Sequence, residues 1–306
     1  MMIKNYSIVD ESVNSRLDRW FRRNVSDVPQ SLIEKNLRKG NIKVNNKKVK
    51  SSYKLCLKDQ VTVRNLSIIP NKNKINKEKY NPTRKEVSST SNIFIENNEN
   101  FVVINKPPGI SVQSGTNSKR NILDILRKTQ EFNESSPFTV HRIDKDTTGI
   151  LIVAKTRKYA QLFTSLFRIR KIHKTYLGIV LGNLNKAKGT FVDNLVYHEG
   201  KKKVILKAIT HFKVIDSNNN YSFLELNPET GRKHQLRKQL LLHGHPIIGD
   251  SKYRLSKDTF SKSNRLMLHA YSINFSINNK KFKYKADIPL DFKKLLKEKY
   301  LRSSLL

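Results

Sequence analysis

The chain has 306 residues, a length typical of about two domains, and 37% of them are hydrophobic, which is enough for a globular core. Its 60 lysines and arginines outnumber its 25 acidic residues and give a formal net charge of +35. Such a charge attracts polyanions and makes a nucleic acid the expected partner, although lysines on solvated faces could supply part of it. The single cysteine, Cys56, excludes an internal disulfide framework and a cysteine-based zinc cluster.

The apolar segments of the chain are short. None approaches the length of a membrane span, and Asp10 and Glu11 interrupt the region where a signal peptide would be apolar. We therefore expect no membrane association and a cytoplasmic location, and a lone cysteine fits a reducing compartment.

Residues 1–66 are expected to form a small basic module. Ser15 is a candidate N-cap for a first helix, and Pro29 and Gly40 suit the two ends of a second helix. The apolar residues that share one side of the first helix are Leu17, Trp20 and Phe21. A β-hairpin should follow, with a strand over 42–44, a turn at Asn45-Asn46 with positive φ, and a second strand through Val49.

Two short basic helices followed by a hairpin resemble the S4 RNA-binding domain. The stretches that carry the resemblance are Arg16-Leu17-Asp18, Leu37-Arg38-Lys39-Gly40-Asn41-Ile42-Lys43-Val44-Asn45 and Tyr53-Lys54-Leu55. Asn46 stands where that family usually has glycine, a mild departure because asparagine also tolerates the left-handed region. In that family a basic helix face grips the phosphates of structured RNA. The resemblance therefore implies RNA contacts from Arg16, Arg19, Arg38, Lys39 and Lys43, whereas the residues alone also allow a merely solvated basic surface.

Residues 67–90 have the composition of a basic linker, because Pro70 to Lys79 is almost all Asn, Lys and Ile and no helical or strand period survives. Residues 91–306 follow as a larger domain in which strand-like segments outnumber helices and rarely alternate with them. This order predicts an α+β fold: a mostly antiparallel mixed β-sheet flanked by helices, preceded by the small N-terminal α/β module.

A polar segment, His141 to Gly149, joins two expected strands of the larger domain. The strand that follows, 150–153, is apolar on both faces, so the segment projects from a buried strand. Burying charged groups in such a position costs free energy unless they are paired. Clusters of such groups are typical of functional sites. A solvated loop is the alternative, and the residues alone do not decide between them.

A second polar segment, Thr230 to Arg237, bends at Gly231 into a helix expected over Arg232–Leu242. Arg232 and Arg237 are five residues apart and do not share one helix face, so one can face phosphate and the other the interior. Cations at a helix N-terminus suggest an anionic partner, although surface charge without a partner explains them as well.

A third segment, Lys171 to Leu177, starts an expected strand. Lys174 and Tyr176 lie two residues apart and therefore point to the same face. A lone tyrosine there more often packs than catalyses, so Tyr176 becomes a candidate only in combination with the other segments.

The three segments together resemble the RluA-type family of pseudouridine synthases. The motifs that carry the resemblance are His141-Arg142-Ile143-Asp144 with Thr147-Thr148-Gly149, then Lys174-Thr175-Tyr176, then Thr230-Gly231-Arg232 with His234-Gln235-Leu236-Arg237. Asn105-Lys106-Pro107-Pro108-Gly109 and the Gly249-Asp250 to Tyr253 element also match the family, in the same order. With the S4-like module, the resemblance covers nearly the whole chain.

This resemblance implies an enzyme that breaks the N1–C1′ bond of uridine, turns the base and rejoins it through C5. The reaction needs no redox step, metal or cofactor, and the chain has no dinucleotide fingerprint or P-loop. Asp144 would be the essential ionised carboxylate, which attacks C1′ or C6 or takes a proton from C2′; the sequence leaves these roles open.

The family pattern also implies roles for the neighbours of Asp144. Arg237 would pair with Asp144 and lower its pKa, and Tyr176 would stack on the uracil and could serve in proton removal at C5. Arg142 would fill the place of the extruded base, and Leu236 would form an apolar wall beneath it. Further candidates for substrate contacts are His141 and Arg232.

Two departures from the family pattern stand near these residues. Thr148 replaces a usual serine and keeps the hydroxyl, whereas Lys238-Gln239 replaces the common Val-His after Arg237 and leaves that contact in doubt. None of the expected catalytic positions departs.

Two other functional classes fit parts of the sequence. A catalytically silent RNA-binding or ribosome-assembly factor would use only the basic surfaces, and the presence of Asp144, Tyr176 and Arg237 argues against it. A metal-dependent nuclease could use His243 and His245 on one strand face, but no carboxylate cluster accompanies them, so structural histidines are favoured.

The N-terminal module, with Val28-Pro29-Gln30-Ser31 and Leu37-Arg38-Lys39-Gly40, most resembles the C branch of the family, which implies a substrate in bacterial large-subunit (23S) ribosomal RNA. The D branch, which acts on a different helix of the same RNA, is the alternative. The sequence does not identify the modified uridines, and we expect a monomer.

Overall fold

The computed structural model describes residues 3–64, 80–114, 120–199, 202–255 and 265–302. The chain divides into two compact units, Met1–Lys79 and Tyr80–Leu306. Within the described ranges, every helix is too short or too polar to cross a lipid bilayer.

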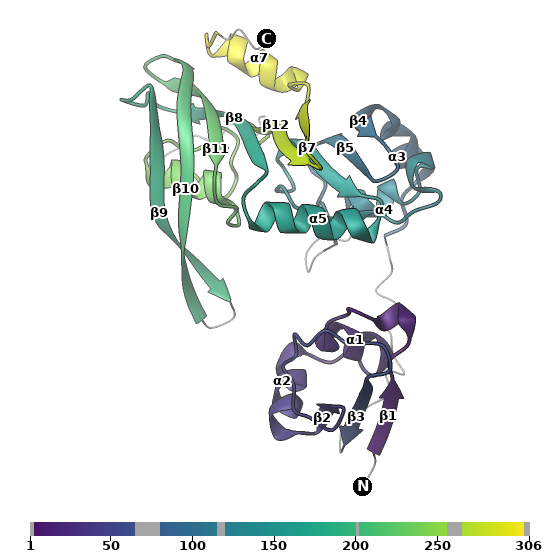
Figure 1. Ribbon diagram of the computed structural model, residues 1–306. Helices are drawn as coiled ribbons and strands as arrows, with labels where there is room; N and C mark the ends of the chain where they lie inside the picture. Colours follow the sequence, from purple (N-terminus) through teal and green to yellow (C-terminus); the bar gives the residue numbers. More distant parts are fainter. Residues whose placement is uncertain (1–2, 65–79, 115–119, 200–201, 256–264, 303–306) are drawn as a thin grey trace. The chain divides into compact units, whose positions relative to one another are not determined.

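The N-terminal unit consists of a three-stranded antiparallel sheet, in the order β1-β3-β2, with helices packed against it (Figure 1). Its elements are β1 (Ile3–Ser7), a 3-10 turn (Asp10–Ser12), α1 (Leu17–Asn24), α2 (Gln30–Lys39), β2 (Ile42–Val44) and β3 (Gln60–Arg64). Leu17, Phe21 and Ile33 from the two helices share one buried cluster with the strand residues Ile42 and Val61. Amphipathic helices over one face of a small sheet thus bury a single core.

The turn chemistry expected from the sequence is confirmed at two places. Gly40 ends α2 in the left-handed conformation with a φ of 76°. Asn45 and Asn46 have φ values of 48° and 60°, as the hairpin turn requires.

Two local expectations in this unit are wrong. Ser15 does not cap α1, because the helix begins only at Leu17, so the N-cap position falls on Arg16, which makes no side-chain capping bond. The strand expected through Val49 does not form either. The partner of β2 is β3, because Val61 and Val63 alternate in register with Val44 and Ile42 and bury the same face.

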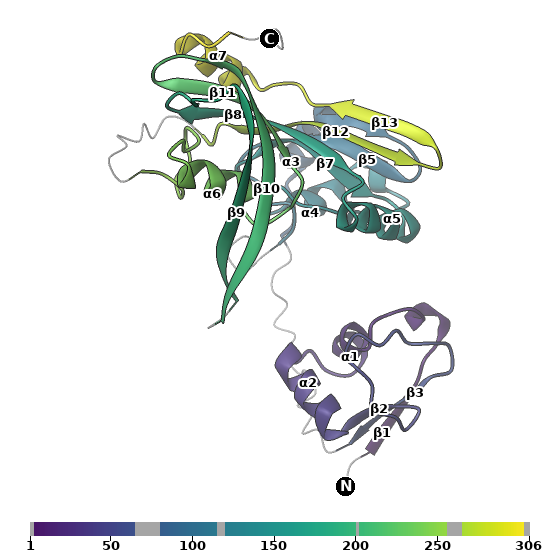
Figure 2. The ribbon, with the colours of Figure 1, turned by 60° about the vertical axis from the view of Figure 1, so that its left-hand side comes forward.

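The second unit is built on one large sheet with the strand order β4-β5-β7-β12-β8-β11-β10-β9, while β13 pairs with β12 and β6 with β7 (Figures 1 and 2). Its strands are β4 (Phe94–Asn97), β5 (Phe101–Lys106), β6 (Phe138–Thr139), β7 (Thr148–Ala154), β8 (His173–Leu181), β9 (Lys188–Glu199), β10 (Lys202–Ser217), β11 (Tyr221–Pro228), β12 (Leu268–Ile277) and β13 (Lys280–Lys285). Its helices are α3 (Arg84–Ser89), α4 (Ile122–Leu126), α5 (Arg157–Arg168), α6 (Gln235–Leu242) and α7 (Leu290–Glu298), with 3-10 turns at Ser91–Ile93 and Gln130–Phe132. Among the described pairs, β7 and β12 run parallel and the others antiparallel, which confirms the α+β class and the mixed sheet.

The strand that follows the polar turn, β7, is buried on both faces. Leu151 packs in one cluster with Leu126 of α4, and Ile152 packs in another with Phe163 of α5. Since successive strand residues point to opposite faces, α4 and α5 cover opposite sides of the sheet. The turn before β7 therefore emerges from a strand that is buried on both faces.

The linker expected over 67–90 is wrong for its last part. Residues 67–79 lie outside the described ranges, but Tyr80 onwards belongs to the second unit, and α3 forms within the expected linker. Thr83 caps this helix: its side chain accepts from the Glu86 N–H, and the Glu86 carboxylate accepts from the Thr83 N–H. A capping box can start a helix too short to show a hydrophobic period.

Candidate active site

Asp144 lies in the turn that leads into β7, and this turn is held at both ends. The Thr147 N–H donates to the Asp144 carbonyl oxygen at 3.2 Å. Just beyond it, Gly149 has a φ of 106°, and a Cβ there would overlap the carbonyl oxygen of Ala270 in β12. Only glycine allows β7 and β12 to approach this closely, which accounts for the glycine that ends the polar segment.

A buried lysine also holds this turn through hydrogen bonds to backbone carbonyl oxygens. The Lys106 ammonium donates to the carbonyl oxygens of Pro107 (2.7 Å), Ile110 (3.1 Å) and Lys145 (3.0 Å). Burial lowers the pKa of Lys106 to about 7, and the nearby carboxylates of Asp146 and Asp144 oppose this change. The Asn105–Gly109 stretch thus anchors the residue next to Asp144.

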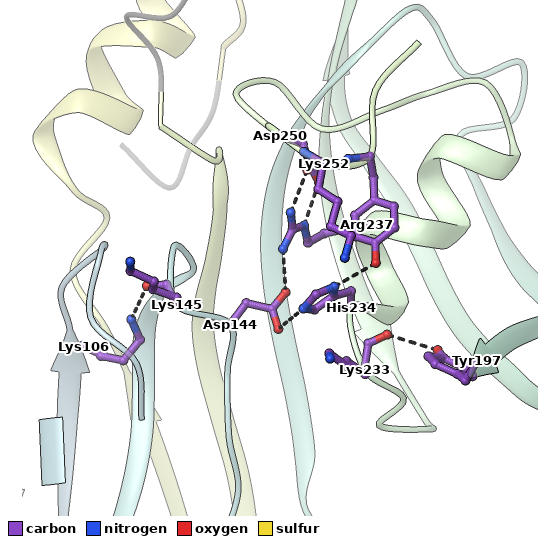
Figure 3. A network of polar contacts seen from close by, with 10 residues as sticks. Lys106, Asp144, Lys145, Tyr197, Lys233, His234, Arg237, Asp250 and Lys252 are labelled. Carbon is purple, nitrogen blue, oxygen red and sulfur yellow. Dashed lines mark hydrogen bonds and ion pairs between the residues drawn. The ribbon is translucent and has the colours of Figure 1, made fainter. Parts of the chain in front are cut away.

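Arg237 of α6 binds two carboxylates at once (Figure 3). Its Nε and Nη2 donate to Asp250 at 2.7 Å each, and its Nη1 donates to Asp144 Oδ2 at 3.2 Å. Burial disfavours the guanidinium charge, but the two carboxylates outweigh this and raise the pKa of Arg237. The side chain of Asp250 is fully buried and that of Asp144 is 24% exposed, so the arginine carries one carboxylate that is structural and one that faces the site.

The other oxygen of Asp144 faces an imidazole. His234 Nε2 lies 3.7 Å from Asp144 Oδ1 (Figure 3). His234 Nδ1 lies 2.9 Å from the hydroxyl oxygen of Tyr253. Burial lowers the pKa of His234, Asp144 opposes this, and Arg237 with two neighbouring lysines adds to it.

Tyr176 reaches the site from β8, where it pairs in register with Ala270 and Leu226 on the two neighbouring strands. Burial, and secondarily the charge of Asp144, raises the pKa of its phenol. The ring is therefore neutral at physiological pH, which suits a stacking surface better than a base.

Asp144, Tyr176, His234 and Arg237 line one cavity of about 810 Å³. The expected site residues of the second unit that line it are Asp144, Tyr176, Arg237, His141, Arg142, Arg232 and Leu236. Seven cationic side chains but only two carboxylates line the cavity, so it suits an anionic ligand. The cations are Arg142, Arg168, Arg170, Lys174, Arg232, Lys233 and Arg237.

His141 is fixed by its surroundings. Its Nε2 accepts the Ile152 N–H at 2.8 Å, and its ring stacks on Phe167 with centroids 4.5 Å apart. Burial, together with the nearby Lys174, lowers the pKa of His141 to about 3. The imidazole is therefore neutral, with the proton on Nδ1, and it ties the start of the polar segment to β7.

The basic residues expected to contact RNA in the N-terminal unit are mostly exposed. The side chains of Arg19, Arg38 and Lys39 are exposed on α1 and α2. Arg16 is also exposed but binds Asp18 through Nε (3.1 Å) and Nη2 (2.7 Å), whereas Lys43 is half-buried beside Gly40.

The two histidines weighed as metal ligands bind different partners. His243 lies at the end of α6, with Nε2 at 3.2 Å from the Asp193 carboxylate, and His245 Nδ1 lies 3.0 Å from the carbonyl oxygen of Leu181. The described residues contain no group of three or more histidine, cysteine or acidic side chains arranged to hold a metal. The geometry favours the structural interpretation of these histidines.

Four residues around Asp144 were not among the sequence candidates: Lys106, His234, Asp250 and Tyr253. All four belong to segments that carry the family resemblance, so the signal was present. It did not reveal which of these side chains converge on Asp144, because that depends on contacts between distant segments.

Comparison with known proteins agrees with this site and fold. The sequence model of the RNA pseudouridylate synthase family matches residues 100–242. The chain is 35% identical to "Ribosomal large subunit pseudouridine synthase C" of Buchnera aphidicola subsp. Baizongia pistaciae, over 95% of this chain and 96% of that protein. It is 28% identical to the protein of the same name from Escherichia coli, over 90% of this chain and 89% of the relative.

A solved structure, human RNA Pseudouridylate Synthase Domain Containing 4, superposes with a TM-score of 0.61 at 25% identity over 71% of this chain and 96% of that one. The fold and the site define an enzyme with a cationic cavity around an aspartate–arginine pair. The chain belongs to the RNA pseudouridine synthase family, a family of isomerases, which confirms the resemblance of its motifs.

Proposed function

We propose that this enzyme converts uridine to pseudouridine in bacterial large-subunit ribosomal RNA and that Asp144 is its catalytic carboxylate. The observation that carries the proposal is the Asp144–Arg237 pair at 3.2 Å in the wall of the cationic cavity. The relatives named for large-subunit ribosomal RNA, which align over nearly the whole chain, support the substrate.

The reaction cleaves the N1–C1′ bond, forms a C5–C1′ bond, removes the proton from C5 and leaves one on N1. Asp144 attacks C1′ or C6, or takes a proton from C2′, and each role requires an ionised carboxylate on the cavity side. Arg237 supplies a positive charge and an N–H donor at Oδ2, which favours that form and fixes its direction. The chemistry is redox-neutral, so no cofactor is proposed.

The target nucleotide must leave its helix, because C1′ and C5 are inaccessible within a stacked duplex. Tyr176, neutral and on the cavity wall, would stack on the flipped uracil, and Leu236 would form an apolar surface beside it. Arg142, exposed at the cavity, would occupy the place the base left.

We further propose that residues 1–66 act as the S4-like RNA-binding module and that residues 91–306, with the segment from Tyr80, form the catalytic domain. The RNA phosphates would be contacted by the exposed side chains of Arg19, Arg38 and Lys39, together with Arg16 and Lys43. A phosphate can neutralise a cation that stays solvated, so binding does not require the cation to be buried. The enzyme would act as a monomer, since each proposed role is filled within one chain.

A catalytically silent RNA-binding factor is the competing function. A factor that only binds RNA can use solvated arginines and does not need a buried one. Arg237, however, is buried between two carboxylates. Burial of this kind favours a catalytic use of Asp144.

The test is tritium release to water from RNA labelled at uracil C5. Transcripts of large-subunit RNA, small-subunit RNA and transfer RNA are compared at equal uridine content. We expect release from the large-subunit transcript alone. No release from any RNA would contradict the enzyme proposal, and equal release from the other transcripts would contradict the proposed substrate.

A further inference from the structure

The two carboxylate oxygens of Asp144 contact two different side chains (Figure 3). Arg237 donates to Oδ2, and His234 Nε2 approaches Oδ1 at 3.7 Å. A carboxylate held at one oxygen still rotates about its Cβ–Cγ bond, whereas a contact at each oxygen fixes its plane. The contact of His234 with Oδ1 can therefore fix the plane of the carboxylate, which the contact of Arg237 with Oδ2 alone does not do.

His234 reaches Asp144 from an unusual backbone conformation. It immediately precedes α6 with a φ of 53° and a ψ of 32°, in the left-handed region that few non-glycine residues adopt, Asn, Asp and His more often than the others. Its side chain makes no capping bond to the helix. Buried Gln235 instead accepts the Arg232 N–H at 3.1 Å and the Thr230 hydroxyl at 2.7 Å, which leaves the imidazole free to point at Asp144. Strain of this kind next to a site suggests a function for the side chain.

The protonation of the imidazole follows from its two neighbours. An ionised carboxylate only accepts hydrogen bonds, so the imidazole tautomer that suits Asp144 carries its hydrogen on Nε2. In that tautomer Nδ1 is the acceptor for the Tyr253 hydroxyl, whose oxygen lies 2.9 Å away. Burial raises the pKa of Tyr253, which keeps this hydroxyl protonated as a donor.

One short segment, residues 250–253, contacts both Arg237 and His234. Asp250, which binds Arg237, also accepts the backbone N–H groups of Lys252 (2.9 Å) and Tyr253 (2.8 Å). The Tyr253 ring lies 5.0 Å from the Arg237 guanidinium. Residues 250–253 thus hold Arg237 through a carboxylate and His234 through a phenol.

We propose that Tyr253 and His234 form a second positioning relay for Asp144, in which Tyr253 donates to His234 Nδ1 and His234 Nε2–H donates to Asp144 Oδ1. This inference rests on the proposed function of Asp144. The distance of 3.7 Å is longer than a hydrogen bond, and the contact shortens when substrate engages the carboxylate, as catalytic hydrogen bonds commonly do. His234 and Tyr253 act through Asp144 and are positioning residues.

The first experiment compares Tyr253→Phe with Tyr197→Phe in the full-length enzyme. Tyr253→Phe removes the hydroxyl but keeps the ring beside Arg237. Tyr197→Phe is the matched control, because the Tyr197 hydroxyl donates to the Lys233 carbonyl oxygen, one residue from His234, but has no path to Asp144. Tritium release from large-subunit RNA gives kcat and KM. We expect Tyr253→Phe to lower kcat about fivefold, the effect of one neutral hydrogen bond, with KM unchanged and the control like the wild type.

The second experiment separates the imidazole from its backbone conformation. Asparagine tolerates the left-handed region, but its amide reaches only the position of Nδ1, whereas the glutamine amide can place an N–H near that of Nε2. We expect kcat to fall in the order wild type, His234→Gln, His234→Asn. Thermal unfolding checks that each variant is folded.

Three outcomes would overturn the relay: an unchanged kcat in Tyr253→Phe, an equal loss in Tyr197→Phe, or full activity in His234→Asn. Failure of the proposed function looks different, because the wild type would then release no tritium or Asp144→Ala would remain active.

Discussion

Arg237 in the second unit and Arg38 in the N-terminal unit are the same residue type in opposite environments. Arg237 is 7% exposed and bound to two carboxylates, whereas Arg38 is exposed on the last turn of α2. A buried cation requires an opposite charge inside the protein, while a solvated cation can bind phosphate without a large desolvation cost. In a chain of net charge +35, burial and pairing therefore distinguish the cation that we propose orients the catalytic carboxylate from the cations that we propose bind RNA.

The largest contrast should come from removing each arginine. Arg237→Met leaves the fully buried Asp250 carboxylate without its partner and should lower the free energy of unfolding by about 3–5 kcal/mol. It should also reduce kcat about a hundredfold, because Asp144 loses its orientation. Urea unfolding followed by circular dichroism, and tritium release, measure the two effects.

Arg38→Met is the matched control and should change stability by less than about 0.5 kcal/mol. The single tryptophan, Trp20, lies in the N-terminal unit, so its fluorescence follows that unit separately. A loss of stability in Arg38→Met as large as that in Arg237→Met would break the comparison.

A smaller effect is expected from the solvated cations as a group. Replacing Arg19, Arg38 and Lys39 with alanine should raise KM about tenfold or more at physiological salt and leave kcat unchanged. The slope of log affinity against log salt should fall by about 2–3, in proportion to the lost phosphate contacts.

The control for this variant removes the same charge elsewhere. Lys281, Lys283 and Lys297 are exposed and lie outside the cavity, and their replacement by alanine should leave KM nearly unchanged. Equal losses in both triple variants would show that the charges are interchangeable.

The smallest effect concerns the neutral, half-buried His141. Its pKa of about 3 in the folded protein lies below the ordinary value of 6.5, so between these values only the unfolded chain binds the proton. Stability from this group is complete above about pH 6.5 and is lost as the pH falls, by about 1–2 kcal/mol at pH 5. Urea unfolding of the wild type and of His141→Gln, each at pH 5 and above about pH 6.5, measures this loss of stability. Glutamine keeps an acceptor for the Ile152 N–H, and parallel pH dependences would refute the assignment.

The sequence predicted elements whose signal is local. The apolar segment 150–153 lies within β7, where every residue is buried, so a continuous apolar run marks the strand. Strand β9 was not recognised, because one of its faces is open and residues such as Asp193 and Asn194 break the apolar pattern. The helix expected from Arg232 begins at Gln235, since the Gln235 side chain closes a turn over 232–234.

For the site, the sequence supplied residues but not their geometry. The Asp144–Arg237 contact joins segments 93 residues apart and was expected only from the family resemblance. No local pattern indicates that Tyr253 would face His234, because that contact depends on the left-handed backbone at His234 and on the turn around Asp250.

The most direct test of the account is the substitution Asp144→Asn in the full-length enzyme. Asparagine keeps the size of the side chain and an oxygen for Arg237 but removes the charge. Tritium release from large-subunit RNA and RNA binding by filter retention are measured on the same preparation. We predict that release is abolished while binding stays within about twofold of the wild type; release at the wild-type rate would contradict the assignment of Asp144.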